Sequence, residues 1–145
     1  MKFAVRKAQL SDLDSIFAIE QAHGFNPRSL KQLLFSLEHH QVWVLANDQV
    51  IAFAVFQCVL DEAELLNIVL NKAFQGQGLA KQLLSQSLES LQQQGILQCL
   101  LEVGESNLTA QGLYRTLGFK EIAVRKNYYH LASGVQDALI FEYRF

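Results

Sequence analysis

The apolar residues of this chain follow two spacings, and the spacing separates expected helices from expected strands. A short run of β-favouring residues, 68–70, is followed by a loop at 75–78 that contains two glycines. After the loop, leucines recur every three or four residues on one helical face, at Leu79, Leu83, Leu84, Leu88 and Leu91. The pattern predicts a strand, a tight loop and a helix that ends at Gly95.

The same two spacings divide the rest of the chain. Strands are predicted over residues 3–7, 42–46, 50–60, 63–70, 97–103, 119–126 and 138–145. A first helix is predicted from Ser11, as its N-cap, to about residue 22, and a second from Pro27 onward. The second helix has a predicted buried stripe of Leu30, Leu33, Leu34 and Leu37, and a last helix is predicted from Ser106 or Asn107 to Leu117.

The order of these elements is β-α-α-β-β-β-α-β-α-β-β, which is an α/β fold with a mixed sheet in a single domain over residues 1–145. The helix after the glycine loop joins two strands, so strands 63–70 and 97–103 are expected to run parallel. Asp61 and Glu62 form a turn that is expected to make strand 63–70 antiparallel to strand 50–60. One right-handed crossover is too few for a full Rossmann domain.

The composition removes several classes of function. The 145 residues are 50% hydrophobic and 18% charged with a net charge of −2, which indicates a packed globular domain and argues against a broad nucleic-acid surface. Cys58 and Cys99 lie in apolar runs and are expected to be buried thiols, and the four histidines have no metal-ligand spacing. No signal peptide or membrane-spanning run is recognised, so a cytoplasmic protein is expected.

The glycine loop predicts an anion site, because a loop that opens a helix presents unpaired backbone N–H groups together with the positive end of the helix dipole. Three interpretations fit the letters. In the first, the loop is an ordinary strand-to-helix turn. In the second, it is a dinucleotide fingerprint with Glu102 as the later acidic residue, although Lys81 stands at the third glycine position. The third is the pyrophosphate loop of an acyl-CoA-dependent transferase, which Gln75, Gly78 and Ala80 match.

Glu102 is a single carboxylate in an otherwise apolar strand pattern at residues 99–103. An unpaired buried carboxylate is costly. It is therefore either a glutamate at a strand end that reaches water, or a functional acid or base.

Taken together, motifs over the C-terminal two-thirds of the chain resemble the GCN5-related N-acetyltransferases (GNAT), and among them the bacterial ribosomal-protein-alanine N-acetyltransferases. The motifs are Val59-Leu60-Asp61-Glu62-Ala63, Asn67-Ile68, the loop from Gln75 to Ala80, Leu101-Glu102-Val103, Ser106-Asn107, Leu113-Tyr114, Leu117-Gly118-Phe119 and Arg125-Lys126-Asn127-Tyr128-Tyr129. The resemblance implies the GNAT (acyl-CoA N-acyltransferase) fold, in which a bulge splays the fourth strand from the fifth.

The resemblance also implies roles for individual residues. Glu102 is implied as the base that takes a proton from the acceptor amine, and Tyr114 as the acid that protonates the leaving thiolate. Tyr128 and Tyr129 are implied to line the acceptor slot. The implied acetyl-CoA site consists of Ile68, Val69, Leu70, Gln75, Gly76, Gln77, Gly78, Leu79, Ala80, Lys81 and Asn107. No metal is implied, and no residue pattern suggests a covalent nucleophile, so direct transfer in a ternary complex is expected.

The implied acceptor is a protein N-terminus, the alanine of the eighteenth small-subunit ribosomal protein, with no nucleic acid or membrane as direct partner. Because that protein is basic, Asp61, Glu62 and Glu105 are expected to ring the acceptor mouth. Asn26-Pro27 replaces a Pro-Trp pair of the family in the connection beside the acceptor. Two alternatives stay open: acetylation of a lysine or a small amine, and a non-catalytic acyl-CoA-binding module.

Overall fold

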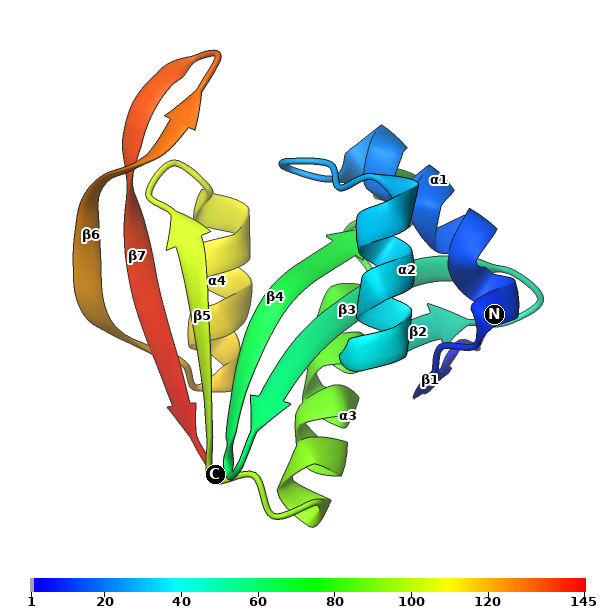
Figure 1. The fold of residues 1–145 in the computed structure, drawn as a ribbon. Helices are drawn as coiled ribbons and strands as arrows, with labels where there is room; N and C mark the ends of the chain where they lie inside the picture. Colours follow the sequence, from blue (N-terminus) through cyan, green and yellow to red (C-terminus); the bar gives the residue numbers. More distant parts are fainter. Residues whose placement is uncertain (1) are drawn as a thin grey trace.

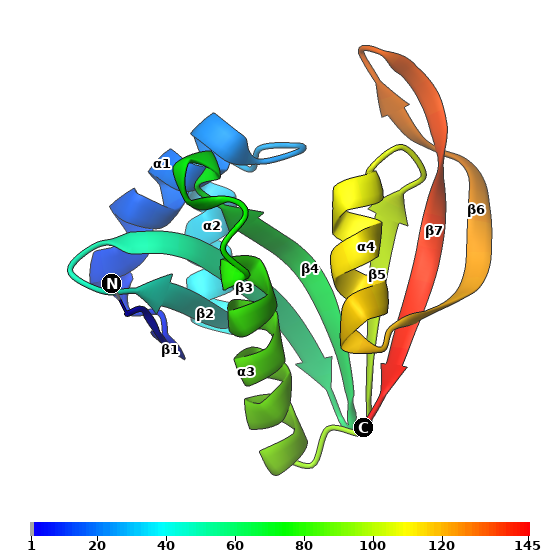
Figure 2. The ribbon, with the colours of Figure 1, turned by 180° about the vertical axis from the view of Figure 1, so that it is seen from behind.

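The computed structural model describes residues 2–145 as one seven-stranded sheet in the order β1-β2-β3-β4-β5-β7-β6, with helices on both faces (Figures 1 and 2). The strands are β1 (Ala4–Lys7), β2 (Gln41–Ala46), β3 (Val50–Val59), β4 (Glu62–Leu70), β5 (Gln98–Gly104), β6 (Lys120–Leu131) and β7 (Gly134–Arg144). The helices are α1 (Leu13–His23), α2 (Leu30–His39), α3 (Leu79–Gln93) and α4 (Leu108–Leu117), with short 3-10 turns at Leu10–Asp12 and Lys72–Phe74. The predicted element order is confirmed.

Two apolar cores hold the helices on the sheet, one on each face. On one face α3 and α4 cover the strands, and the buried residues include Leu83, Leu91 and Tyr114. On the other face α1 and α2 cover β2 to β4, with Ile16, Leu33 and other residues at their centre. Because α1 and α2 do not extend over β5 and β7, one face of those two strands is left without a helix (Figure 1).

Two predicted helix starts are wrong. Ser11 does not cap α1; it lies inside a 3-10 turn, and Asp12 occupies the N-cap position. Helix α2 begins at Leu30 rather than at Pro27, because Ser29 and Gln32 form a capping box in which each side chain accepts from the other residue's backbone N–H. Leu30 is consequently exposed instead of belonging to the buried stripe.

The splay between β4 and β5 is confirmed. The two strands pair in parallel only from Glu62–Gln98 to Leu65–Leu101, and no pairing follows. At the same point the register between β3 and β4 shifts by one residue, so Leu66 forms a bulge in β4. β5 continues to pair with β7 as far as Gly104. The sheet therefore opens into a wedge whose closed end lies near the C-terminus (Figure 1).

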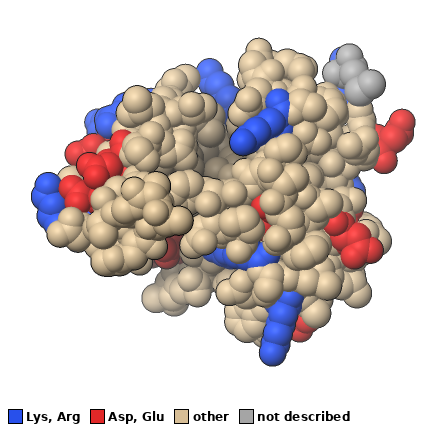
Figure 3. All heavy atoms as spheres, turned by 90° about the horizontal axis from the view of Figure 1, so that it is seen from above, with Lys and Arg blue, Asp and Glu red and all other residues tan. Residues whose placement is uncertain are grey.

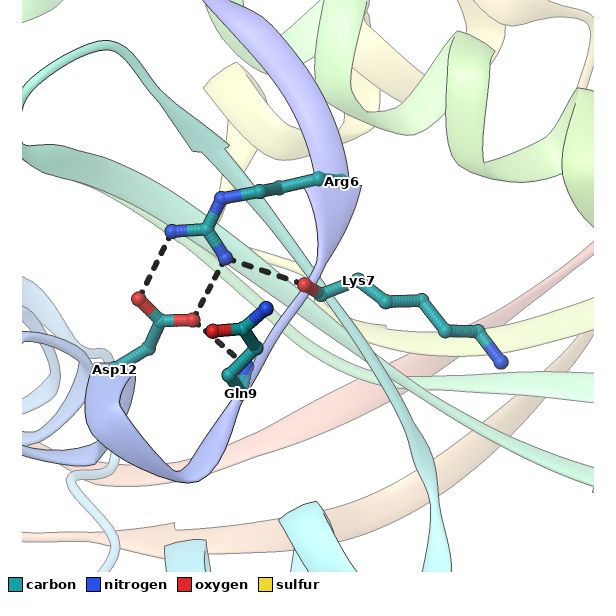
Figure 4. Close-up of polar contacts among 4 residues, drawn as sticks. All are labelled: Arg6, Lys7, Gln9 and Asp12. Carbon is teal, nitrogen blue, oxygen red and sulfur yellow. Dashed lines mark hydrogen bonds and ion pairs between the residues drawn. The ribbon is translucent and has the colours of Figure 1, made fainter.

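A charged pair fastens β1 to the start of α1 (Figure 4). Arg6 contacts both carboxylate oxygens of Asp12, at 2.8 and 2.9 Å, and the backbone N–H of Gln9 donates to the same carboxylate at 2.7 Å. The Asp12 side chain is 10% exposed and the Arg6 side chain 44%. The Arg6 hydrogen bonds lower the pKa of Asp12, so the carboxylate stays charged in the fold.

Replacing Asp12 with alanine is expected to lower the free energy of unfolding at pH 7 by about 2 kcal/mol, because the Gln9 amide loses its acceptor and Arg6 its partner. A lowered pKa in the fold means that this stabilisation is complete above the unfolded-state pKa of about 3.9 and is lost as pH falls through the folded-state value. Urea unfolding at pH 7 and pH 3 measures both effects. Asp14→Ala, in the same turn but exposed, is the control; equal losses in the two variants would contradict this account.

Candidate active site

The open end of the wedge contains a cleft of about 260 Å³. Its walls come from β4 around the bulge, the end of β5, α4 and its N-cap, the α1–α2 connection and β6. Viewed from above, the surface is hollowed between the two halves of the molecule (Figure 3). The cleft therefore joins segments that are more than 100 residues apart in the sequence, and it lies where the sheet has backbone groups without a strand partner.

Glu102 reaches this cleft because of its place in the alternation of β5. Its neighbours Leu101 and Val103 are 1% and 5% exposed and face the core under α3 and α4, so Glu102 faces the opposite, uncovered side. Its carboxylate oxygen Oε1 lies 3.1 Å from the Arg125 guanidinium of β6. The Glu102 side chain is 23% exposed, so the carboxylate is neither isolated nor fully buried.

Tyr114 enters the cleft from α4. Its ring packs against Phe119 and Phe141 with centroid distances of 5.7 and 6.1 Å, and the residue is 6% exposed. Burial raises the pKa of the Tyr114 phenol well above its ordinary value. The hydroxyl is therefore protonated at neutral pH and can act as a donor toward a group in the cleft.

Asn107 determines where α4 starts. Its side-chain oxygen accepts from the Ala110 backbone N–H at 3.2 Å, which is an N-cap, and its side chain also lines the cleft. Within residues 2–145 the side-chain NH₂ of Asn107 has no hydrogen-bond acceptor, so it can donate to a ligand. Ile68 of β4 lines the cleft from the opposite wall.

The glycine loop lies beyond the end of β4 and leads into α3 (Figure 2). Gly76 and Gly78 have φ angles of 80° and 72°, a region that side chains disfavour, and Gly78 is the N-cap of α3. Leu79, Ala80 and Lys81 occupy the first turn, so their N–H groups have no acceptor within the helix. The loop lies outside the cleft wall, since none of residues 75–81 lines the cleft.

Two of the predicted cofactor residues can contribute only backbone groups. The side chains of Val69 and Leu79 are buried in the two cores, at 5% and 8% exposed. Gln75, Gln77 and Lys81 are exposed. A ligand along this edge would therefore meet only main-chain groups at Val69 and Leu79, but could also contact the three exposed side chains.

The two predicted acceptor tyrosines differ in position. Tyr129 lines the cleft and makes an edge-to-face contact with Phe25 of the α1–α2 connection, at 5.9 Å. Burial, together with the nearby charge of Glu102, raises the pKa of Tyr129. Tyr128 is 45% exposed and packs behind it, 5.2 Å from Tyr129 and 5.1 Å from the Arg125 guanidinium. Tyr128 thus supports the wall instead of forming it.

The structure contradicts the predicted acidic ring. Asp61 and Glu62 lie at the closed end of the wedge, where the Glu62 side chain accepts from Gln98 and the Asp61 carbonyl accepts from the Leu97 N–H. Of the three acids, Glu105 lies at the open end, and its carboxylate accepts from the backbone N–H of Asp137 at 3.0 Å. The cleft opens after Leu65, the fourth residue of β4, so the turn before β4 cannot border it.

Three charged residues near the cleft have no predicted role: Arg125, Arg28 and Glu20. Arg28 lines the cleft, and Glu20 lies behind it with 1% exposure. Burial of Glu20 could have been expected from the sequence, because Glu20 stands at the position of α1 that continues the apolar spacing of Leu13, Ile16 and Phe17. Nothing in the sequence singles out Arg125 or Arg28, since arginine on a strand or loop is ordinarily a solvated surface residue.

Neither a metal site nor a membrane segment is found in residues 2–145. No three His, Cys, Asp or Glu side chains in this part of the chain come close enough together to hold a metal ion. None of its helices combines the length and apolar character required to cross a bilayer. Both cysteines are free thiols, and burial raises the pKa of Cys99 to about 12.

Comparison with known proteins gives consistent matches. The family model described as "Acetyltransferase (GNAT) family" matches residues 8–119. The [ribosomal protein bS18]-alanine N-acetyltransferase of Haemophilus ducreyi is 41% identical over 87% of this chain and 88% of its own, and that of Escherichia coli K12 is 37% identical over 94% and 93%.

Solved structures agree with these matches. The ribosomal-protein-S18-alanine N-acetyltransferase from Escherichia coli superposes with a TM-score of 0.92 at 35% identity, over 98% of this chain and 93% of its own. A Bacillus subtilis acetyltransferase in complex with CoA shares the fold, with a TM-score of 0.84 at 17% identity over 99% of both chains.

Proposed function

This chain belongs to the GNAT acetyltransferase family and is an N-acetyltransferase, and from that premise we propose that it acetylates the N-terminal alanine of ribosomal protein bS18, with acetyl-CoA as donor. The observation that carries the proposal is the wedge cleft, in which a carboxylate and a phenol, Glu102 and Tyr114, line one cavity. The relatives named for this reaction cover about nine-tenths of the chain. We place the reaction in the cytoplasm, where ribosomal proteins are made.

The donor would lie along the free edge of β4. Its diphosphate would accept hydrogen bonds from the backbone N–H groups of the glycine loop and the first turn of α3, where the helix dipole favours an anion. The pantetheine arm would pair with the main chain of Ile68–Leu70 in place of the missing strand. Asn107 would donate to the cofactor from the opposite wall. The acetyl group then reaches the cleft between Glu102 and Tyr114.

Glu102 is proposed as the base. An N-terminal amine has a pKa of about 7.7–8.0, so only on the order of a tenth of it is neutral at pH 7 and able to attack a thioester. A carboxylate in the cleft removes the proton directly or through one water. Tyr114 is proposed as the acid, since its protonated phenol can deliver a proton to the thiolate that leaves when the tetrahedral intermediate collapses.

The charge state of the amine favours an N-terminus over a lysine side chain. A lysine has a pKa of about 10.4, so fewer than about one in a thousand is neutral at pH 7. The acceptor slot is narrow, because Phe25 and Tyr129, which both line the cleft, contact each other at 5.9 Å and leave no passage between their rings. A chain end is the part of a protein that can enter such a slot.

An alanine-started peptide with the bS18 N-terminal sequence is expected to gain one acetyl group, as measured by intact mass after incubation with acetyl-CoA. A copy that is blocked at its N-terminus but keeps its lysines is expected to remain unmodified. Acetylation of the blocked copy would instead identify a lysine acetyltransferase. Tight CoA binding without modification of either peptide, or of free bS18, would identify a non-catalytic module.

A further inference from the structure

Glu20 is a carboxylate buried to 1% exposure on the sheet-facing side of α1. An apolar residue would cost less at this place, because a buried carboxylate must be compensated by hydrogen bonds. Burial accordingly raises its pKa. The charge lies behind the cleft wall, so it touches neither proposed substrate directly.

The contacts of this carboxylate join three segments. Asn67 of β4 donates its side-chain N–H to Oε2 at 2.6 Å. Burial raises the pKa of Glu20, and Asn67 and the nearby Arg28 act in the opposite direction. Oε1 lies where a Cβ on Gly24 would approach within 2.6 Å, so the carboxylate fills the space beneath that glycine. Glu20 thus connects the end of α1, the α1–α2 connection and β4.

The attachment point on β4 is the bulge itself. Leu66 is the extra residue, Asn67 follows it, and the Arg28 side chain donates to the Leu66 carbonyl at 3.2 Å. Two successive residues at the bulge are therefore held, Leu66 through its carbonyl by Arg28 of the α1–α2 connection and Asn67 through its side chain by Glu20 of α1. Both of these residues, and Arg28, line the cleft.

We propose that Glu20 is a positioning residue for acetyl transfer: its carboxylate holds the α1–α2 connection on the β4 bulge and so aims the unpaired backbone N–H groups of β4 at the thioester carbonyl. The proposal rests on the proposed function in placing the acetyl group along this edge. Loss of the Glu20 contacts would act electrostatically on the reaction, because an N–H donor that is misplaced by a fraction of an ångström no longer stabilises the developing oxyanion.

The test exchanges donor and acceptor within the pair. Glu20→Gln removes the charge that strengthens the Asn67 hydrogen bond, keeps only one accepting oxygen and can oppose the Asn67 NH₂ with its own. Asn67→Asp places two carboxylates against each other. In the double variant the glutamine donates to the aspartate, and the net charge of the pair is unchanged. Glu38→Gln, an exposed glutamate on α2, is the matched control.

Turnover is expected to fall about tenfold in each single variant, with the KM for acetyl-CoA within about twofold of wild type, and to recover in the double variant. The second readout needs no acceptor: the ¹³C shift of the labelled acetyl carbonyl in bound acetyl-CoA. It is expected to move downfield on binding to wild type, less so in the singles, and to be restored in the double.

Melting temperatures are measured first, and Asn67→Ala replaces Glu20→Gln if that variant does not fold. Wild-type turnover and carbonyl shift in a folded single variant, or a double variant no better than the worse single, would overturn the positioning role. A wild-type enzyme that polarises bound acetyl-CoA but leaves the alanine peptide unmodified would refute the proposed acceptor and leave the Glu20 comparison intact.

Discussion

Glu102→Gln is expected to reduce turnover by about 10³-fold while leaving the affinity for acetyl-CoA nearly unchanged. The reason is that an amide of the same shape cannot accept the amine proton, and general-base catalysis contributes roughly 10²–10⁴ in rate. The fold should tolerate the change, because the Arg125 side chain that loses its partner is 55% exposed and can be solvated. Initial rates with an alanine-started peptide, and acetyl-CoA titration by calorimetry, measure the two quantities.

The pH profile separates loss of a base from loss of shape. Without Glu102 the reaction depends on amine that is already neutral in solution, so the residual rate of the variant should rise with pH through about 7.7–8.0, the amine pKa. Glu89→Gln, an exposed glutamate on α3, should behave as wild type. A Glu102→Gln enzyme as fast as wild type at pH 7 would remove the proposed base.

The Arg125 partner of Glu102 could not be predicted, and the reason is local backbone geometry. The register between β6 and β7 shifts between Arg125 and Tyr129, where Asn127 has a φ of 53°. The Asp137 carboxylate holds this irregularity by accepting from the Asn127 N–H at 2.8 Å and pairing with Lys126 at 3.1 Å. A second shift, of one residue, lies earlier in β6, between Glu121 and Ala123. Because a one-residue shift reverses the face of the side chains that follow, strand alternation cannot place Arg125.

The element order, by contrast, was predictable, because it depends on long apolar patterns that tolerate errors at their ends. Helix boundaries were less predictable. Pro27 suggested a start for α2, but the capping box of Ser29 and Gln32 sets the actual start. Both residues of this box can be recognised in the sequence. The wrong prediction of an acidic ring around the acceptor mouth could also have been avoided. Asp61 precedes β4 and Glu62 is its first residue, whereas a wedge in parallel strands opens toward their carboxyl ends.

The site itself was predicted in part. The Glu102 alternation and the glycine loop are sequence signals with a physical reason, whereas the role of Tyr114 came from family resemblance alone. Glu20 illustrates a third case, in which a carboxylate interrupts an apolar helical stripe. Such an interruption indicates that the carboxylate has a buried hydrogen-bond partner. That partner, Asn67, is 47 residues away in the sequence, so only the folded structure identifies it.

Tyr114→Phe is expected to lower turnover by about 10²-fold, less than the loss of Glu102, because water can replace part of a proton donor's effect. Stability should be preserved, since the ring contacts with Phe119 and Phe141 do not involve the hydroxyl. Tyr143→Phe is the matched control, because Tyr143 packs on Phe119 at 5.3 Å but does not line the cleft.

The chemistry of the leaving group supplies the decisive comparison for Tyr114. If the phenol protonates the departing thiolate, an acetyl thioester whose thiol is more acidic than CoA needs less help to leave, so the difference between wild type and Tyr114→Phe should shrink with that donor. Single-turnover rates with the two thioesters measure this. An unchanged difference would mean that the hydroxyl serves binding or alignment, because an interaction that is equal in ground and transition states does not depend on the leaving group.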